Sequence, residues 1–270
     1  KEINMSLKVG ADPELFALDS MGFVRPVHSW LPGTKAAPHK VNGGAVQVDG
    51  FAAEFNIDPA ETAKEFDEHI KSVLNELGKL KPKNVSLHAT PFISISSTAW
   101  DETPAEYKEL GCSPDWDADG NVLFSEKTIK HLNINRFRTG SGHLHLGWGD
   151  KLIIDDAHLN DCRMVARIFD TYFRTHILPA GSYSSREIYY GKPTAHRPKP
   201  YGVELRVPSN HWLRYRDNQN SYAWMFNSVK ELMEKIQDPA NSLLKLELGQ
   251  YPLKTNRGDH FTRQPKTLVA

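Results

Sequence analysis

The sequence has few cysteines, no excess of charge of either sign and no long apolar segment. Cys112 and Cys162 are its only cysteines in 270 residues, which is too few for a disulfide framework, and they form no C-x-x-C pair. We therefore expect a reducing, cytoplasmic environment, with one bridge between these two thiols as the alternative.

The balance of charge argues against two classes of partner. The 33 basic and 33 acidic side chains give a net charge of zero, so no overall positive field attracts nucleic acid or an anionic membrane. No segment approaches the roughly 18 to 20 continuous apolar residues of a membrane helix, and the first residues lack the apolar core of a signal peptide. We expect a globular protein that binds neither nucleic acid nor membrane.

The first eighty residues combine strands with one amphipathic helix. Apolar and polar residues alternate between Gly, Pro and Asn breaks, which predicts strands over 6–19, 22–27 and 45–57. Over 58–80 the apolar residues recur at helical spacing, and Asp58 is the expected N-cap.

The rest of the chain adds strands and helices without a regular alternation. We expect strands over 85–95, 137–150 and 202–207, helices over 155–178 and 217–237, a polar loop over 99–121 and a polar tail after Pro252. Because strand and helix do not alternate as they do in a parallel sheet, the predicted fold class is α+β.

Acidic residues lie on predicted strands, where carboxylates are uncommon. Asp12 and Glu14 are two residues apart, so both side chains leave the same face of a strand. Glu54 has apolar neighbours on both sides, and Asp49 precedes it across a Gly turn. Burying a carboxylate costs several kcal/mol unless a cation compensates it, so basic side chains or a metal ion must lie nearby.

Histidines and a further Glu complete a candidate ligand set. His143 and His145 share one strand face, and Glu204 shares another with Arg206. Carboxylates with one or two imidazoles and no thiolate suit Mg²⁺ or Mn²⁺ better than zinc. Six basic residues near Gly and Pro loops are of the kind that binds a polyphosphate: Arg136, Arg138, Arg186, Lys192, Arg197 and Lys199.

Most of these residues also have an ordinary structural interpretation, which is hardest to give for Glu54 because of its apolar neighbours. A single strand histidine is commonly a satisfied core or surface residue, and Asp12 is placed to cap a turn at Pro13. Glu204 and Arg206 suit an ion pair on an exposed sheet face, and the basic residues of 186–199 suit a solvated loop.

Four segments, taken in order, resemble one family of enzymes. They read GADPEL, DGFAAEFN, GHLHLG and YYGKPTAHRPKPYGVELRVPSN, and they span residues 10–210. GSGHLHLG resembles the G-S-G-x-H-x-H segment of glutamine synthetase, and VELRVPSN resembles its E-x-R-x-P-D segment, whose Glu binds metal and whose Arg contacts phosphate. The closer likeness is to the bacteriophage carboxylate-amine ligases, the type 2 amidoligases of the glutamine synthetase superfamily.

This resemblance implies a fold and its cofactors. The fold is a curved antiparallel β-sheet that forms a half-barrel funnel, with helices on its outer face. ATP enters at one end and the substrates at the other, with at least two Mg²⁺ or Mn²⁺ ions between them. Residues 1–250 would form a single catalytic domain and 251–270 a C-terminal tail. A phage-encoded enzyme of this kind would act in the host cytoplasm.

The resemblance also implies which residues bind the ions. One ion would be bound by Glu14 and Glu54, with Asp49 as a further ligand. The other ion would be bound by Asp12, His143 and Glu204. In glutamine synthetase the histidines follow Gly-Ser-Gly one residue later, so either His143 or His145 is the matching ligand. Asp12 replaces a Glu that is one methylene longer.

The implied reaction is ATP-dependent formation of an amide or isopeptide bond. A carboxylate attacks the γ-phosphate to give an acyl phosphate, from which an amine displaces phosphate. Arg206 would stabilise the transferring phosphoryl group, Arg197 and Lys199 would bind phosphates, and Arg186 would hold the substrate carboxylate. The substrates are expected to be amino acids, peptides or proteins. No segment matches the ammonium site of glutamine synthetase, so ammonia and glutamate are not assumed.

Two other functions fit parts of the same pattern. A metal-dependent hydrolase could use the H-x-H pair with carboxylates around an activated water, although such enzymes place that pair on their first strand. A virion or binding protein could keep the ligase fold without activity.

Overall fold

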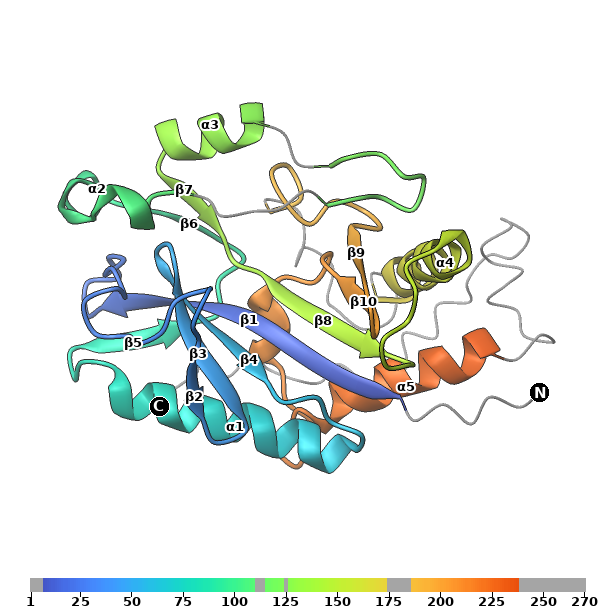
Figure 1. Ribbon diagram of the computed structural model, residues 1–270. Helices are drawn as coiled ribbons and strands as arrows, with labels where there is room; N and C mark the ends of the chain where they lie inside the picture. The colour runs from blue at the N-terminus through green and yellow to red at the C-terminus, as the bar shows by residue number, and fades with distance from the viewer. Residues whose placement is uncertain (1–6, 110–114, 124–125, 174–185, 238–270) are drawn as a thin grey trace.

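A computed structural model of the chain describes residues 7–109, 115–123, 126–173 and 186–237. Figure 1 shows an α+β arrangement in which helices pack against an antiparallel sheet, as the sequence predicts. The strands of this sheet are β1 (Lys8–Asp19), β2 (His39–Val41), β3 (Gly44–Asp49), β4 (Ala52–Ile57), β5 (Val85–His88), β8 (Gly142–Gly147), β9 (His196–Lys199) and β10 (Gly202–Leu205). The other elements are α1 (Ala63–Leu80), α2 (Ser97–Glu102), α3 (Glu126–Ile134), α4 (Asp156–Tyr172), α5 (Ala223–Gln237), the 3₁₀ helices η1 (Ala105–Tyr107) and η3 (Asn210–Arg214), and the small sheet of β6 (Phe92–Ser94) and β7 (Phe137–Thr139).

The long strand β1 organises the main sheet. The strand order is β2-β3-β4-β1-β8-β10-β9, with β5 also paired to β1, and every pairing is antiparallel. Within the described ranges the sheet is open, with β2 and β9 at its two edges. The half-barrel funnel of the glutamine synthetase superfamily therefore stays a prediction.

Alternation along the strands gives the sheet two different faces. Val9, Leu15 and Ala17 of β1 are fully buried in the main hydrophobic core, together with side chains from α1, α4 and α5. Asp12 and Glu14 leave β1 on the opposite face, because successive side chains of a strand point to opposite sides. Helices α1, α4 and α5 thus cover one face, and the candidate site lies on the other.

The N-cap of helix α1 lies four residues after the predicted one, Asp58. The cap is Thr62, whose side chain accepts a hydrogen bond from the Glu65 backbone, while the Glu65 carboxylate accepts one from the Thr62 backbone. This reciprocal capping box satisfies two N–H groups at once, so Asp58 is not the cap. The predicted apolar face is buried, with Phe66, Ile70, Val73 and Leu77 in the core.

Several other boundaries differ from the sequence prediction. The predicted strand 85–95 is two strands in two sheets, separated by the residues around Pro91, which offers no N–H to a ladder. The predicted strand 137–150 is likewise divided into β7 and β8. The stretch 22–27 forms only an isolated bridge between Leu18 and Val24. Helix α5 starts at Ala223 because Asp217 accepts hydrogen bonds from the Gln219 and Ser221 backbones and forms a turn there.

Other elements were missed or lie outside the described residues. Helix α2 overlaps the start of the predicted loop 99–121 and the 3₁₀ helix η1 lies within it, and the short strand β2 and the helix α3 were not predicted. The end of the predicted helix 155–178, Cys112 and the tail 251–270 fall outside the described residues. Cys162 is a buried free thiol.

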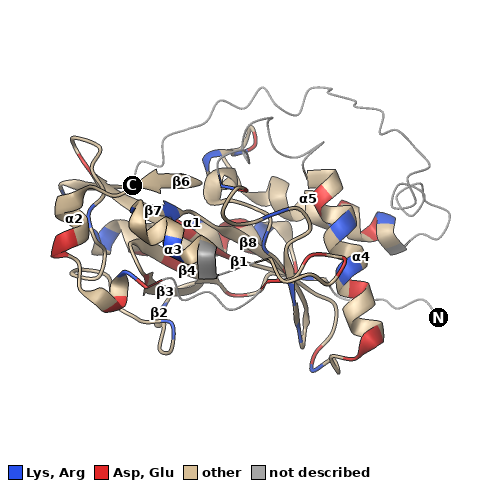
Figure 2. Cartoon of the chain, turned by 90° about the horizontal axis from the view of Figure 1, so that it is seen from above, with Lys and Arg blue, Asp and Glu red and all other residues tan. Residues whose placement is uncertain are grey.

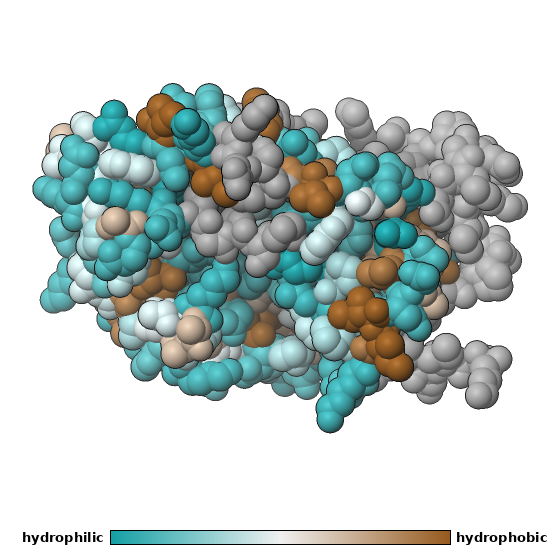
Figure 3. Space-filling model, turned by 45° about the horizontal axis from the view of Figure 1, so that its top comes forward, coloured by the Kyte–Doolittle hydropathy of each residue, from teal (hydrophilic) through white to brown (hydrophobic). Residues whose placement is uncertain are grey.

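Charged residues of both signs are mixed along the chain, and hydrophobic residues form separate patches on the surface. Basic and acidic residues are interspersed on α4 and α5 (Figure 2), as zero net charge leads one to expect. Figure 3 shows a mostly hydrophilic face with separate hydrophobic patches. Among the described residues, no helix combines the length and the apolar character needed to cross a membrane.

Candidate active site

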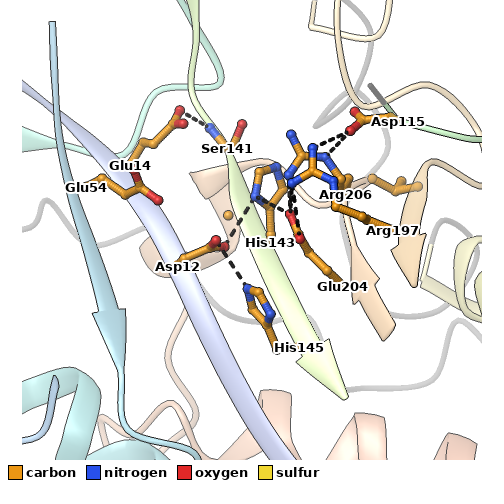
Figure 4. Close-up of polar contacts among 12 residues, drawn as sticks. Asp12, Glu14, Glu54, Asp115, Ser141, His143, His145, Arg197, Glu204 and Arg206 are labelled. Carbon is orange, nitrogen blue, oxygen red and sulfur yellow. Dashed lines mark hydrogen bonds and ion pairs between the residues drawn. The ribbon is translucent and has the colours of Figure 1, made fainter. Parts of the chain in front are cut away.

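Three adjacent strands bring one acidic and histidine cluster together. Asp12 on β1, His143 on β8 and Glu204 on β10 each offer one ligand atom, and these atoms lie within 4.8 Å of one another. His143 Nδ1 is 3.2 Å from Asp12 Oδ1 and 3.8 Å from Glu204 Oε1 (Figure 4). Asp12 and His143 are direct partners in the β1–β8 register. These are the ligands expected for one of the two ions, and two carboxylates with an imidazole suit Mg²⁺ or Mn²⁺.

His145 lies beside this cluster with both of its nitrogens engaged. Its Nε2 is 3.2 Å from Asp12 Oδ2, and its Nδ1 is 2.5 Å from the Tyr201 hydroxyl. His143 Nε2, in contrast, is buried without a hydrogen-bond partner. This arrangement favours His143 as the metal ligand and His145 as the residue that orients the Asp12 carboxylate.

The two histidines also set the protonation of Asp12. Burial raises the pKa of Asp12, but the charges of His145 and His143 and their hydrogen bonds outweigh it and hold that pKa well below its ordinary value. Burial and the nearby Arg206 lower the pKa of His143. An ionised carboxylate is the form of Asp12 that binds a divalent cation.

A second group of carboxylates lies across β1 from the first. Glu14 and Glu54 face each other in the β1–β4 register, and both line a cavity together with Asp49. Glu14 Oε2 accepts a hydrogen bond of 2.7 Å from the Ser141 backbone, and Glu54 Oε2 accepts one of 2.8 Å from the Gln47 side chain. These residues are the ligands expected for the other ion.

The second group is electrostatically unfavourable without a cation. Burial, and next the charge of Asp49, raise the pKa of Glu14 to about 7. Burial also raises the pKa of Glu54 well above its ordinary value, and Asp12, Asp49 and Glu14 add to the effect. Like charges in a low-dielectric site repel one another, so a divalent cation would stabilise the ionised forms of both residues.

Three basic residues surround the Glu204 carboxylate, which is only 2% exposed. Lys199 Nζ lies 2.8 Å and Arg197 Nη1 3.4 Å from Glu204 Oε2. Arg206 Nη1 forms a close ion pair with Glu204 Oε1. Arg197, Lys199 and Arg206 therefore lie next to the candidate metal ligands, and their contacts with phosphate stay a prediction.

A further acidic residue that the sequence analysis missed holds two of these cations. Asp115 Oδ1 is 2.5 Å from Arg206 Nε and 3.1 Å from Arg197 Nη2, and Asp115 is 3% exposed (Figure 4). It lies in the segment predicted to be a polar loop. The Trp116 backbone next to it exchanges two hydrogen bonds with His196 at the start of β9, which fixes the segment against the sheet.

The remaining predicted basic residues have other positions. Arg138 lines the cavity, but it donates to the Phe137 and Lys108 carbonyls and stacks on the Trp100 ring. Arg186 is 1% exposed, and its Nη1 donates to the Val207 carbonyl.

Three of the predicted residues are not brought to the cavity wall. Arg186 is one of them, and its guanidinium group donates a hydrogen bond to the hydroxyl of Ser141, which does line the cavity. Arg136 lies in the turn before β7, with a φ of 53°, and Lys192 lies in the turn before β9. Their expected contacts with substrate or phosphate therefore gain no support from the structure.

Two cavities flank the clustered residues on the polar face of the sheet. One, of about 210 Å³, is lined by both carboxylate groups and by Arg197, Lys199 and Arg206. The other, of about 1030 Å³, lies toward Trp148 and Tyr201. Both cavities are lined by three of the same residues, Asp12, Glu54 and His145.

Comparisons with known proteins give little further guidance. No protein-family model matches the chain, and a search of curated proteins finds no match. Among solved structures, the chain is similar to a bifunctional glutathione synthetase from Pasteurella multocida, with 12% sequence identity and a TM-score of 0.34. The match covers 64% of this chain and 22% of the synthetase, so the chain spans only a small part of that protein's length.

Proposed function

We propose that the protein is an ATP-dependent carboxylate-amine ligase that forms an amide or isopeptide bond through an acyl phosphate. The observation that carries this proposal is the convergence of Asp12, His143 and Glu204 within 4.8 Å, flanked by two partly buried glutamates, Glu14 and Glu54, and by three basic side chains. Carboxylate is a poor electrophile, so amide formation needs the activation that a phosphoryl transfer supplies.

The side chains present fit two divalent cations and a triphosphate. Bound Mg²⁺ or Mn²⁺ would neutralise charge on the phosphate oxygens and on the attacking carboxylate. Asp12, His143 and Glu204 would hold one ion, and Glu14 and Glu54, with Asp49, would hold the other.

The cations of this chain would act on the transferring group. Arg206 is held by ion pairs with Glu204 and Asp115 and would stabilise the negative charge on the phosphoryl group during its transfer. Arg197 and Lys199 would bind the other phosphates, because both lie beside the Glu204 carboxylate and thus beside the candidate metal ion. We assign Arg186 no contact with substrate, because its guanidinium donates to main-chain carbonyls.

The two cavities support a two-sided arrangement of ligands. Because they share Asp12, Glu54 and His145, ligands in the two cavities would approach the same ions from opposite sides. This agrees with the funnel implied by the resemblance to the bacteriophage amidoligases of the glutamine synthetase superfamily. On this proposal the substrates are an amino acid, peptide or protein.

One experiment distinguishes the ligase from its rivals. The protein is incubated with ATP and Mg²⁺ or Mn²⁺, with and without hydroxylamine, across a panel of amino acids and peptides. Substrate-dependent formation of ADP and hydroxamate is expected. Hydrolysis that does not depend on ATP would instead indicate a metal-dependent hydrolase, and inactivity in every condition would indicate a binding protein.

A further inference from the structure

Asp115 forms an ion-pair ring with the residues around Glu204. Arg206 contacts Asp115 through Nε and Glu204 through Nη1, while Arg197 contacts Asp115 through Nη2 and Glu204 through Nη1. Each guanidinium group is thus shared between two buried carboxylates. Asp115 comes from a distant segment of the chain, and backbone hydrogen bonds between Trp116 and His196 hold it beside β9.

The two carboxylates of this ring have different neighbours. Glu204 Oε1, which pairs with Arg206, is also the oxygen that lies 3.8 Å from His143 Nδ1 in the candidate metal cluster. A metal ion on this cluster would therefore compete with Arg206 for the same oxygen. The pairs of Asp115 are on the far side of both guanidinium groups, so an ion at Glu204 leaves them in place.

We infer that Asp115 is a positioning residue that keeps Arg206 and Arg197 directed at the phosphates once a metal ion occupies Glu204. This inference rests on the proposed function. Glu204 and Asp115 share the guanidinium groups of Arg206 and Arg197. If a metal ion and ATP were bound, Glu204 would be a ligand of the ion, the Nη1 groups would be available to phosphate oxygens, and Asp115 would keep its ion pairs with both guanidinium groups. The residue would then act on phosphate affinity without touching phosphate.

A purely structural role predicts a different result. A buried carboxylate between two arginines also offsets their charge, and its loss would destabilise the fold. A destabilised fold would weaken the binding of every ligand of the site alike. A positioning role predicts a loss that grows with the number of phosphates and spares the metal.

The test compares Asp115→Asn with Asp119→Asn, a change of the same chemistry four residues away. Asp119 is 72% exposed and pairs with Arg167, away from the cluster. Binding of Mn²⁺ alone, adenosine, ADP and a non-hydrolysable ATP analogue with Mg²⁺ is measured by calorimetry. In Asp115→Asn we expect affinity for the ATP analogue to fall on the order of 10- to 100-fold, the usual effect of losing a residue that orients a ligand-binding group. Affinity for Mn²⁺ and adenosine should stay within about twofold, and Asp119→Asn should match the wild type.

A second variant covers the case in which Asp115→Asn does not fold. Asp115→Glu keeps the charge but displaces the carboxylate by one methylene, so it should fold and give an intermediate loss of ATP-analogue affinity. Equal affinity of wild type and both variants for the analogue would overturn the inference alone, as would a parallel loss of Mn²⁺, adenosine and analogue. A wild-type protein that binds no ATP analogue with Mg²⁺ would overturn the proposed function as well.

Discussion

Glu14 and Glu54 occupy directly opposite positions on the antiparallel strands β1 and β4. Both side chains lie on the polar face of the sheet, and burial raises the pKa of each, that of Glu14 to about 7. The folded protein therefore binds protons that the unfolded chain releases. This relationship links the stability of the metal-free protein to pH and to divalent cations.

The metal-free protein should lose stability as pH rises through neutrality. A carboxyl group whose pKa is raised on folding favours the folded state most below its ordinary pKa of 4.5, and that contribution is lost as pH rises through about 7. For Glu14 alone the shift corresponds to roughly 3 kcal/mol. Thermal unfolding in EDTA should show Tm falling between about pH 5 and pH 8. A Tm that rises steadily over this range would contradict the raised pKa values.

Removing the charge of Glu54 should stabilise the metal-free protein at high pH. In Glu54→Gln the neutral amide removes the repulsion, so at pH 8 without metal the variant should unfold at a higher temperature than the wild type. The same variant should lose most of the stabilisation that Mn²⁺ gives the wild type, because one ligand is missing. Glu68→Gln on the exposed side of α1 is the control, and both of its unfolding temperatures should match the wild type.

The start of α1 offers a test of the fold that is independent of function. Thr62→Ala removes the side chain that caps the helix, so we expect a loss of about 1 kcal/mol in the free energy of unfolding, measured in urea. Asp58→Ala should cost less than half as much. Within the described part of the chain, Asp58 is hydrogen-bonded to the helix through its backbone carbonyl, which accepts from His69 and remains in the variant. A larger loss in Asp58→Ala would restore the sequence prediction.

The sequence predicts those features of the site that follow from the local geometry of a strand. Alternation of two residues places Asp12 with Glu14, and His143 with His145, on one strand face, so these pairs follow from local geometry. Glu54 is recognisable because the residues on both sides of it in the strand are apolar. Asp115 gave no such signal, because a single Asp in a polar segment resembles any solvated loop residue. Its contacts with Arg197 and Arg206 arise only when the chain folds, since Arg197 lies 82 residues away from Asp115 in the sequence.

The positions of the basic residues depend on tertiary contacts. A cation near Gly and Pro suggests a phosphate-binding loop, yet Arg186 is buried and donates to main-chain carbonyls. A sequence pattern reports the charge of a side chain but not the direction in which tertiary contacts turn it. Arg197, Lys199 and Arg206 differ from Arg186 because they meet the buried carboxylate of Glu204.

Arg206→Lys should impair phosphoryl transfer although it keeps the positive charge. Lysine has one amine and cannot contact Asp115 and Glu204 in the fixed geometry of the guanidinium fork. We expect kcat for ATP turnover to fall on the order of 100-fold, the cost of removing one preorganised donor. Arg167→Lys, at an exposed ion pair with Asp119, should leave kcat unchanged. If Arg206→Lys retains full kcat, Arg206 does not stabilise the phosphoryl group.

The last prediction concerns the choice between the two histidines. His143 Nδ1 faces both Asp12 and Glu204, whereas His145 bridges Asp12 and the Tyr201 hydroxyl. Loss of a ligand costs more metal affinity than loss of a residue that orients a ligand, which typically costs about 10- to 100-fold. In a titration of Mn²⁺ followed by electron paramagnetic resonance, His143→Ala should therefore weaken binding more than His145→Ala does. Tyr201→Phe should weaken binding least, since it removes only the hydrogen bond that orients His145. The reverse order of the two histidine variants would make His145 the ligand and His143 the orienting residue.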